Sequence, residues 1–163
     1  MTLSEDELKK IFWDYADEKK AIFITRAIVE ARKTQKIDTT EKLVNLIQKA
    51  SFDKKSPLRV FQALRIAVND EFSHILTSLE QATENLRIGG QIAVITFHSI
   101  EDRLVKNFFS PLLQGQIDEV TGQTIVPPKF KKVNKKPIAP SEEEIQNNPR
   151  ARSAKLRIYE RIS

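Results

Sequence analysis

Apolar residues in the first part of the chain recur with the period of an α-helix. Leu8 and Phe12 share one face, and they follow Ser4 and Glu7, whose side chains can bond each other's backbone N–H groups and so cap a helix. Similar spacing predicts a second helix and a third. Their apolar faces are Ala21, Ile24, Ile28 and Ala31, then Leu43, Leu46, Ile47 and Ala50 behind a cap at Thr39 or Thr40. Three short amphipathic helices predict a small helical bundle.

A fourth helix is predicted to begin at Ser56 and Pro57, because Pro in the first turn of a helix loses no hydrogen bond there. We expect three residues on its buried side: Phe61, Leu64 and Val68. On an adjoining side, polar residues repeat at spacings of three and four: Gln62, Arg65 and Asn69. From periodicity alone this polar stripe is most simply a solvated face, since surface helices carry one.

A fifth helix leads into a change of period. Gly89 and Gly90 follow it and supply the positive φ of a C-terminal cap. Residues 91–97 are then apolar with little alternation, which is typical of a strand covered on both faces in an α/β sheet. Ser99 with Asp102 can cap the helix that follows. A helix, a glycine pair and a buried strand make half of an α/β unit, so we expect the α/β class.

The remainder of the chain predicts short strands and turns. Residues 114–123 are polar, with Thr121 and Gly122 at a hairpin tip. Residues 129–133 are predicted to form a strand, and Ser141 begins a short helix. A final half-exposed strand is predicted where Ala154, Leu156 and Ile158 alternate with Lys155, Arg157 and Tyr159.

Composition and charge narrow the class of protein. With 163 residues, 40% of them hydrophobic and 30% charged, the chain is typical of a soluble protein of one or two domains. It has no Cys, which excludes a disulfide framework, a zinc ribbon and a Cys nucleophile. No apolar run is longer than that of residues 92–95, and acidic residues follow Met1, so we expect no membrane span and a cytoplasmic location.

The positive charge gathers near the end of the chain. From Pro128 to Ser163, six Lys and four Arg stand against four Glu, a net charge of +6, whereas the first 127 residues carry about −1. A tail this basic favours a polyanionic partner such as nucleic acid. From charge alone, a basic surface that faces only solvent is an equally good interpretation.

Candidate chemistry lies at the end of the predicted strand 91–97. Ligands of open α/β sheets bind at the carboxyl ends of strands, which is where His98, Ser99, Glu101 and Asp102 stand. Taken alone, helix capping by Ser99 and Asp102 is the simpler interpretation of this cluster. The only other histidine, residue 74, is too distant in sequence to suggest a metal site, and the glycine pair precedes a strand, so it is not a dinucleotide fingerprint.

Three long segments carry a resemblance to a known family. They read RVFQALRIAVNDE at residues 59–71, GGQIAVITFHSIEDRLVK at 89–106 and KPIAPSEEEIQNNPRARSAKL at 136–156. In this order they resemble the C-terminal part of the RsmH/MraW family of bacterial 16S rRNA (cytosine-N4)-methyltransferases. The resemblance implies a helical insert domain at residues 1–57. It also implies that residues 58–163 are the C-terminal half of a Rossmann-like class I methyltransferase sheet, with the basic tail.

The resemblance also implies an activity, which is S-adenosylmethionine-dependent N4-methylation of a cytidine in the decoding region of 16S rRNA, on the small ribosomal subunit. It makes His98, Ser99, Glu101 and Asp102 a wall of the pocket for the target base, which must be isolated for chemistry at its amine. The RNA-binding candidates are Gln62, Arg65, Asn69, Lys129, Lys131, Lys132, Arg150 and Arg152. We expect neither a DNA partner nor a membrane partner, and no metal.

Two departures from the family bear on this implication. The family's glycine-rich cofactor loop, acidic ribose residue and Ser-Ser-Pro-type motif belong upstream of the point where this sequence begins. The resemblance therefore assigns no cofactor-binding residue here, and we expect an incomplete sheet that is inactive alone. Residues 55–58 also replace a longer His-Pro-Ala-Thr-like segment. Three interpretations stay open: half of a methyltransferase whose N-terminal half is missing, one subunit of a split enzyme, or a non-catalytic RNA- or ribosome-binding module.

Overall fold

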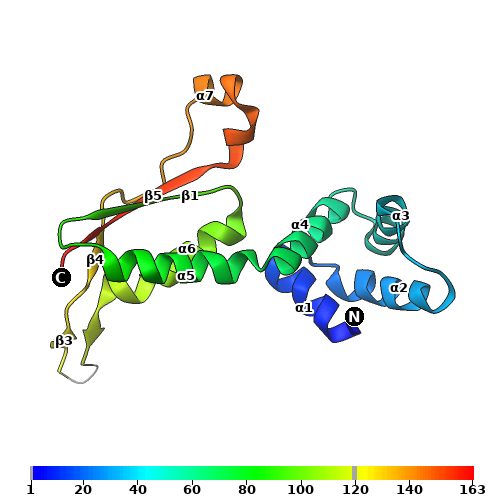
Figure 1. Ribbon diagram of the computed structural model, residues 1–163, viewed down its shortest axis with the longest axis horizontal. Helices are drawn as coiled ribbons and strands as arrows, with labels where there is room; N and C mark the ends of the chain where they lie inside the picture. The colour runs from blue at the N-terminus through cyan, green and yellow to red at the C-terminus, as the bar shows by residue number, and fades with distance from the viewer. Residues whose placement is uncertain (1, 119–120) are drawn as a thin grey trace. The chain divides into compact units, whose positions relative to one another are not determined.

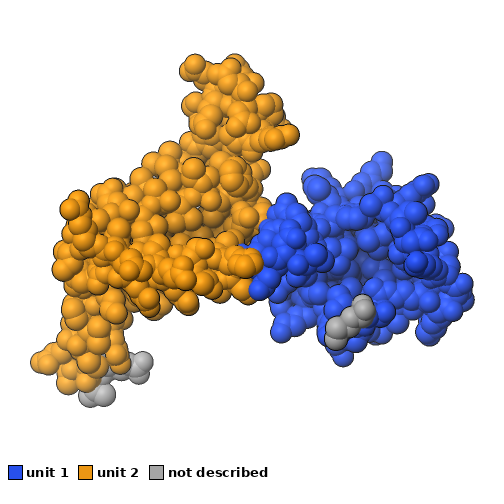
Figure 2. All heavy atoms as spheres, in the orientation of Figure 1, with its two compact units in different colours: residues 1–71 blue, residues 72–163 orange. Residues whose placement is uncertain are grey.

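The computed structural model describes residues 2–118 and 121–163. The chain divides into two compact units, Met1–Glu71 and Phe72–Ser163 (Figure 2). The first unit is helical, and the second combines helices with a small antiparallel sheet (Figure 1). This mixture of helix and sheet agrees with the α/β class. The division between the compact units lies after Glu71, and the domain boundary after residue 57 stays a prediction.

The first unit is a bundle built on the predicted amphipathic faces. Its helices are α1 (Glu5–Ala16), α2 (Ala21–Thr34), α3 (Thr40–Ser51) and α4 (Ser56–Asn69). Ser4 and Glu7 cap α1 reciprocally, with the Ser4 N–H 2.7 Å from Glu7 Oε2 and the Glu7 N–H 3.3 Å from Ser4 Oγ. Thr39 caps α3. The buried core includes Leu8, Phe12, Ile24, Ile28, Ile47 and Val60.

α4 turns a different face to the core from the one we predicted. Its buried residues are Ser56, Pro57, Val60, Ala63 and Ile66. Phe61 and Leu64 are only half-buried, and Val68 is 83% exposed. Because Val60 and Ala63 belong to the same apolar cluster as the α1 side chains, α4 is part of the bundle. This packing extends the first unit to Glu71.

The second unit is a three-stranded sheet with two long helices packed on it. Its elements are α5 (Glu71–Asn85), β1 (Gln91–Thr96), α6 (Ser99–Gln114), β2 (Gln116–Ile117), β3 (Thr124–Val126), β4 (Phe130–Lys132), α7 (Glu142–Asn147), a 3₁₀ helix (Pro149–Ser153) and β5 (Lys155–Arg161). The strand order is β1-β5-β4, so the last strand lies in the middle, antiparallel to both neighbours (Figure 1).

β2 and β3 form the predicted hairpin. Thr121 and Gly122 lie between these strands, as we expected for its tip. Residues 119 and 120, which belong to the polar turn that we predicted, lie outside the described residues.

The sheet buries one of its faces. Ile92 and Val94 of β1 and Tyr159 of β5 pack with side chains of α5 and α6. The Tyr159 ring stacks on Phe109 of α6, with ring centroids 3.7 Å apart and planes 8° apart. We predicted that β1 is covered on both faces, but its exposure alternates, and Ile95 is 58% exposed. The apolar run gave no alternation from which a single buried face could have been recognised.

Gly89 and Gly90 shape the turn from α5 into β1 for different reasons. Gly89 has a φ of 78°, in the region that favours glycine, and its N–H donates to the carbonyl of Arg161. We predicted a positive φ for both glycines, but among the described residues only Gly89 of the pair has one. Gly90 is needed for space, because a β-carbon there would lie 2.7 Å from the Leu86 side chain.

Candidate functional site

β1 leads directly into α6 through His98, which is the N-terminal cap of that helix. The Glu101 N–H donates to His98 Nδ1 at 3.2 Å, and the Glu101 carboxylate accepts from the N–H groups of Phe97 at 2.7 Å and His98 at 3.3 Å. These bonds satisfy N–H groups that the start of a helix leaves open. Our prediction that Ser99 with Asp102 caps α6 was wrong, because the His98 ring nitrogen takes the capping position one residue earlier.

Glu101 is held as a carboxylate by this cap. Burial raises the pKa of Glu101, but the His98 ring and the N–H groups of Phe97 and His98 outweigh burial, so its pKa lies below the ordinary value. An ionised carboxylate has no proton to donate near neutral pH, and its oxygens already face donors. Glu101 is therefore suited to hold His98 in place and not to move a proton.

Asp102 points to β5, where it forms a bidentate ion pair with Arg157. Arg157 Nε donates to Asp102 Oδ1 at 2.6 Å and Nη2 donates to Oδ2 at 3.0 Å. The two side chains are 10% and 13% exposed, and Lys155 Nζ lies 3.6 Å from the same carboxylate. The hydrogen bonds from Arg157 hold the pKa of Asp102 below its ordinary value, against the effect of burial. The pair fastens α6 to the central strand.

At the β1–α6 junction, Phe97 and Ser99 are exposed to solvent. The Phe97 side chain is 55% exposed, and Ser99 is exposed at the first position of α6. His98 Nε2 is buried, and it lies 3.0 Å from Glu101 Oε1 without the geometry of a hydrogen bond. Because Nδ1 accepts from Glu101, a neutral His98 ring carries its proton on Nε2. An exposed aromatic face beside a hydroxyl can orient a flat polar ring.

The polar stripe of α4 belongs to the first unit, and the carboxylate of Glu71 binds to it. Arg65 donates from Nε and Nη2 to Glu71 at 2.8 and 3.1 Å, and Asn69 donates to the same side chain at 3.2 Å. Arg65 and Asn69 are exposed, whereas Gln62 is half-buried. Glu71 lies just beyond the end of α4, so the helical period that revealed the stripe did not reveal its partner.

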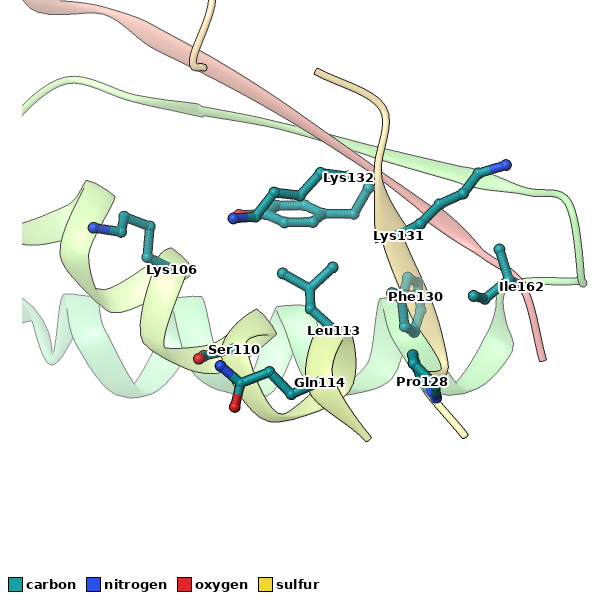
Figure 3. A pocket seen from close by; sticks show the side chains of 10 residues that line it. Lys106, Ser110, Leu113, Gln114, Pro128, Phe130, Lys131, Lys132 and Ile162 are labelled. Atoms are coloured by element: carbon teal, nitrogen blue, oxygen red, sulfur yellow. The ribbon is translucent and has the colours of Figure 1, made fainter. Parts of the chain in front are cut away.

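Lysines surround a cavity of about 460 Å³ between α6 and β4. Lys106 of α6 and Lys131 and Lys132 of β4 line it, above apolar residues that include Leu113 and Phe130 (Figure 3). Lys131 Nζ lies 2.7 Å from Glu160, but Lys106 and Lys132 make no ion pair with any described residue. Lys106 was missed by sequence reasoning because it belongs to a helix outside the basic tail.

The other predicted basic residues lie outside this cavity. Lys129 lines a second cavity of about 610 Å³ together with Glu80, Glu84 and Arg161. Two more, Arg150 and Arg152, are exposed on the 3₁₀ helix. The structure thus gathers Lys131 and Lys132 with Lys106, and it leaves Lys129, Arg150 and Arg152 elsewhere on the second unit.

The described residues do not form a site for a metal ion or a nucleoside cofactor. Within residues 2–118 and 121–163, no three metal-binding side chains are grouped to hold an ion, and no helix is long and apolar enough to cross a membrane. β1 is followed by Phe97 and His98, where a nucleoside-binding turn requires glycine for close approach. Glu101 and Asp102 are both engaged and unavailable to a ribose hydroxyl. This end of the sheet does not fit a nucleoside cofactor.

Comparisons with known proteins match the chain along almost its whole length. The sequence pattern of the MraW methylase family matches residues 1–162. The chain is also 44% identical, over 169 residues, to the ribosomal RNA small subunit methyltransferase H of Limosilactobacillus fermentum. That alignment covers 98% of this chain and 54% of the relative, so the chain spans about half the length of the curated relative that it matches. From the extent of these matches, the chain belongs to the MraW methylase family.

Proposed function

We propose that this chain is the RNA-facing half of an S-adenosylmethionine-dependent methyltransferase. Its reaction is N4-methylation of a cytidine in the decoding region of 16S rRNA, on the small ribosomal subunit in the cytoplasm. The observation that carries the proposal is the family match over residues 1–162, supported by the name of the relative. The lysine-lined cavity and the open β1–α6 junction are consistent with an RNA substrate.

In this proposal, the β1–α6 junction forms one wall of the pocket for the target cytosine. Transfer to an exocyclic amine requires its lone pair to line up with the methyl group, so positioning contributes more than a strong base. Phe97 offers an apolar surface to the ring and Ser99 offers an exposed hydroxyl, while His98 caps the helix that carries Ser99. Glu101 and Asp102 are positioning residues, because Glu101 orients His98 and Asp102 fastens α6 to β5.

Phosphate contacts in this proposal come from the basic surface of the second unit. Lys106 and Lys132 have no carboxylate partner among the described residues, so they can neutralise phosphates and release counterions. The α4 stripe of the first unit is a further candidate, although Glu71 offsets the charge of Arg65. The remaining proposed RNA contacts are Lys129, Lys131, Arg150 and Arg152.

The methyl donor needs a site that the described residues do not form. S-adenosylmethionine supplies the methyl group when it is bound. We place its site in polypeptide equivalent to the part of the relative that this chain does not match. The exposed sheet face at Ala93 and Ile95 supports this proposal, because an apolar sheet face is normally buried by another layer of structure.

The test is a complementation assay on small ribosomal subunits that lack the modification. This chain is mixed with the unmatched segment of the Limosilactobacillus fermentum protein, and transfer of a labelled methyl group to 16S rRNA is mapped by nuclease digestion and mass spectrometry. We expect N4-methylcytidine from the mixture and none from either polypeptide alone. Subunit binding without any transfer would favour a non-catalytic binding module. Saturable binding of S-adenosylmethionine to this chain alone, measured by calorimetry, would contradict our placement of the cofactor site.

Two substitutions separate the capping role of His98 from a role in positioning the base. Asn is a favourable N-cap residue and Ala is not, so His98→Asn keeps the start of α6 and His98→Ala weakens it. A positioning role predicts that both variants lower kcat of the complemented enzyme by about tenfold or more, with the KM for S-adenosylmethionine unchanged. If His98 is only a cap, His98→Asn has the activity of the unsubstituted chain.

A further inference from the structure

Phe52 occupies a backbone position that is unfavourable for its residue type. It is the C-terminal cap of α3, with φ 54° and ψ 24°, in the left-handed region where a β-carbon crowds the backbone and glycine or asparagine is usual. The other described non-glycine residues with positive φ are Asp17 and Asp70, of a type that tolerates this region better. Backbone preference therefore does not account for a phenylalanine here.

Packing does not account for Phe52 either. Its side chain is 94% exposed, so the ring gains almost none of the free energy that burial gives an aromatic residue. Leu58, in the first turn of α4, is 74% exposed. A large apolar ring that contributes to no core and strains its own backbone is a candidate for contact with another molecule.

The loop that carries Phe52, residues 52–55, is held firmly in place. Asp53 accepts a hydrogen bond from Arg59 Nη2 at 2.6 Å and another from the Lys55 N–H at 2.8 Å. Arg59 Nε in turn donates at 2.7 Å to Glu18, whose side chain is fully buried. These contacts fasten Asp53, the residue after Phe52, to α4 and to the buried Glu18, so the exposed ring stands next to an anchored residue.

Charges around the ring point to the class of ligand. Lys49, Lys54 and Lys55 lie within three residues of Phe52 in the sequence and are exposed, and the first two make no ion pair with any described residue. Asp53, the carboxylate within the loop, is already engaged by Arg59. Aromatic rings interleaved with lysines are typical of proteins that bind single-stranded nucleic acid, whereas the cores of protein interfaces are depleted of lysine.

We propose that Phe52 is a stacking platform for an unpaired base of RNA, with the neighbouring lysines on the adjoining phosphates. This inference rests on the proposed rRNA substrate. It adds a contact in the first unit that is separate from the β1–α6 junction and from the lysine-lined cavity.

The test measures binding of the whole chain to a short fluorescein-labelled single-stranded RNA by fluorescence anisotropy. Phe52→Ala is expected to raise Kd about five- to 160-fold, which corresponds to the loss of one stacked base. Phe52→Trp, which keeps a stacking surface, is expected to stay within about threefold of the unsubstituted chain. The matched control is Ile88→Ala, in the second unit, because Ile88 is also an exposed apolar residue at 67% and has no proposed RNA contact.

Phe52→Gly distinguishes a binding role from a structural one. Glycine relieves the left-handed backbone, so this variant is expected to melt about 2 to 4 °C higher, although it loses RNA affinity as the alanine variant does. A purely structural role would move thermal stability and RNA affinity in the same direction. Lys49→Gln and Lys54→Gln are each expected to lower the slope of log Kd against log salt by about 0.7.

Each alternative result has a defined meaning. Equal RNA affinity of Phe52→Ala and the unsubstituted chain overturns the stacking inference and leaves the proposed function intact. Weaker binding of Phe52→Ala to whole small subunits, with unchanged binding to the short RNA, identifies a protein contact and overturns the inference as well. If the unsubstituted chain binds no RNA at all, both the inference and the RNA substrate of the proposed function fail.

Discussion

Replacing Asp102 by Ala is expected to destabilise the second unit by about 3 kcal/mol. The variant leaves the Arg157 guanidinium, only 13% exposed, without its bidentate partner and with Lys155 still nearby. Removing one partner of a buried pair costs about 3 to 5 kcal/mol, because the remaining charge is uncompensated. We take the lower end, since about a tenth of each side chain still reaches water.

A double-mutant cycle isolates the interaction itself. Arg157→Met removes the charge and keeps most of the length of the side chain. The combined variant carries no unpaired charge, so we expect it to be about 2 kcal/mol more stable than the sum of the single effects predicts. A matched cycle on Glu30 and Lys33 of α2, which are 72% and 64% exposed, is expected to give no measurable coupling.

The assay must follow the second unit alone. The only tryptophan, Trp13, lies in the first unit, so its fluorescence serves as an internal reference that should not change. Hydrogen exchange read by mass spectrometry on peptides from β1 and β5, over a urea series, gives the stability of the sheet. A coupling between Asp102 and Arg157 no larger than that of the α2 pair would refute this reasoning.

The same ion pair sets an acid limit on stability. In the folded chain the pKa of Asp102 lies below its ordinary value of 3.8, so the unfolded chain binds this proton at a higher pH than the folded chain does. The contribution of Asp102 is therefore complete above about pH 5 and is lost as pH falls through 3.8 toward the folded pKa. Asp102→Asn should flatten this part of the stability profile, which acid titration of the sheet's hydrogen exchange would measure.

Three further outcomes are expected. Gly90→Ala should destabilise the second unit by about 1 to 3 kcal/mol in urea unfolding, because the new β-carbon would lie 2.7 Å from Leu86. Glu18→Gln should destabilise the first unit by about 2 kcal/mol, followed by tryptophan fluorescence, because a buried arginine contact loses its charged acceptor. Lys106→Gln combined with Lys132→Gln should lower the salt slope of RNA binding by about 1.4 and leave thermal stability unchanged.

Local sequence patterns predicted the helices and strands better than the faces they bury. The spacing of Leu8 and Phe12 predicted α1 and its inner face, because Ile11 and Tyr15 lie beside them on the same side of the helix. α4 carries apolar residues on more than one side, so its period did not determine whether Val60 or Val68 faces the bundle. The α6 cap was missed because histidine is not among the usual N-cap residues, and Ser99 is.

The sequence indicated candidate residues at the β1–α6 junction, but it did not indicate the contacts that they make. His98 and Glu101 are three residues apart and do bond each other, as closely spaced residues at a helix start can. Asp102 and Arg157 are 55 residues apart, and no periodicity relates them. Alternation in β5 predicted a half-exposed strand, but the inner side carries Arg157 and Tyr159, because stacking on α6 and the ion pair outweigh simple hydrophobicity.

The position of β5 in the middle of the sheet has a consequence for biosynthesis. Gln91 of β1 bonds Glu160 of β5 across 69 residues of sequence, and β4 also pairs with β5. During translation β1 and β4 thus emerge before β5, the strand with which both of them pair. The helices of the first unit, by contrast, have all emerged by then and can pack on one another. A nascent chain stalled before Lys155 should therefore hold a folded helical bundle followed by unpaired strands, so folding of the second unit is timed by its final segment.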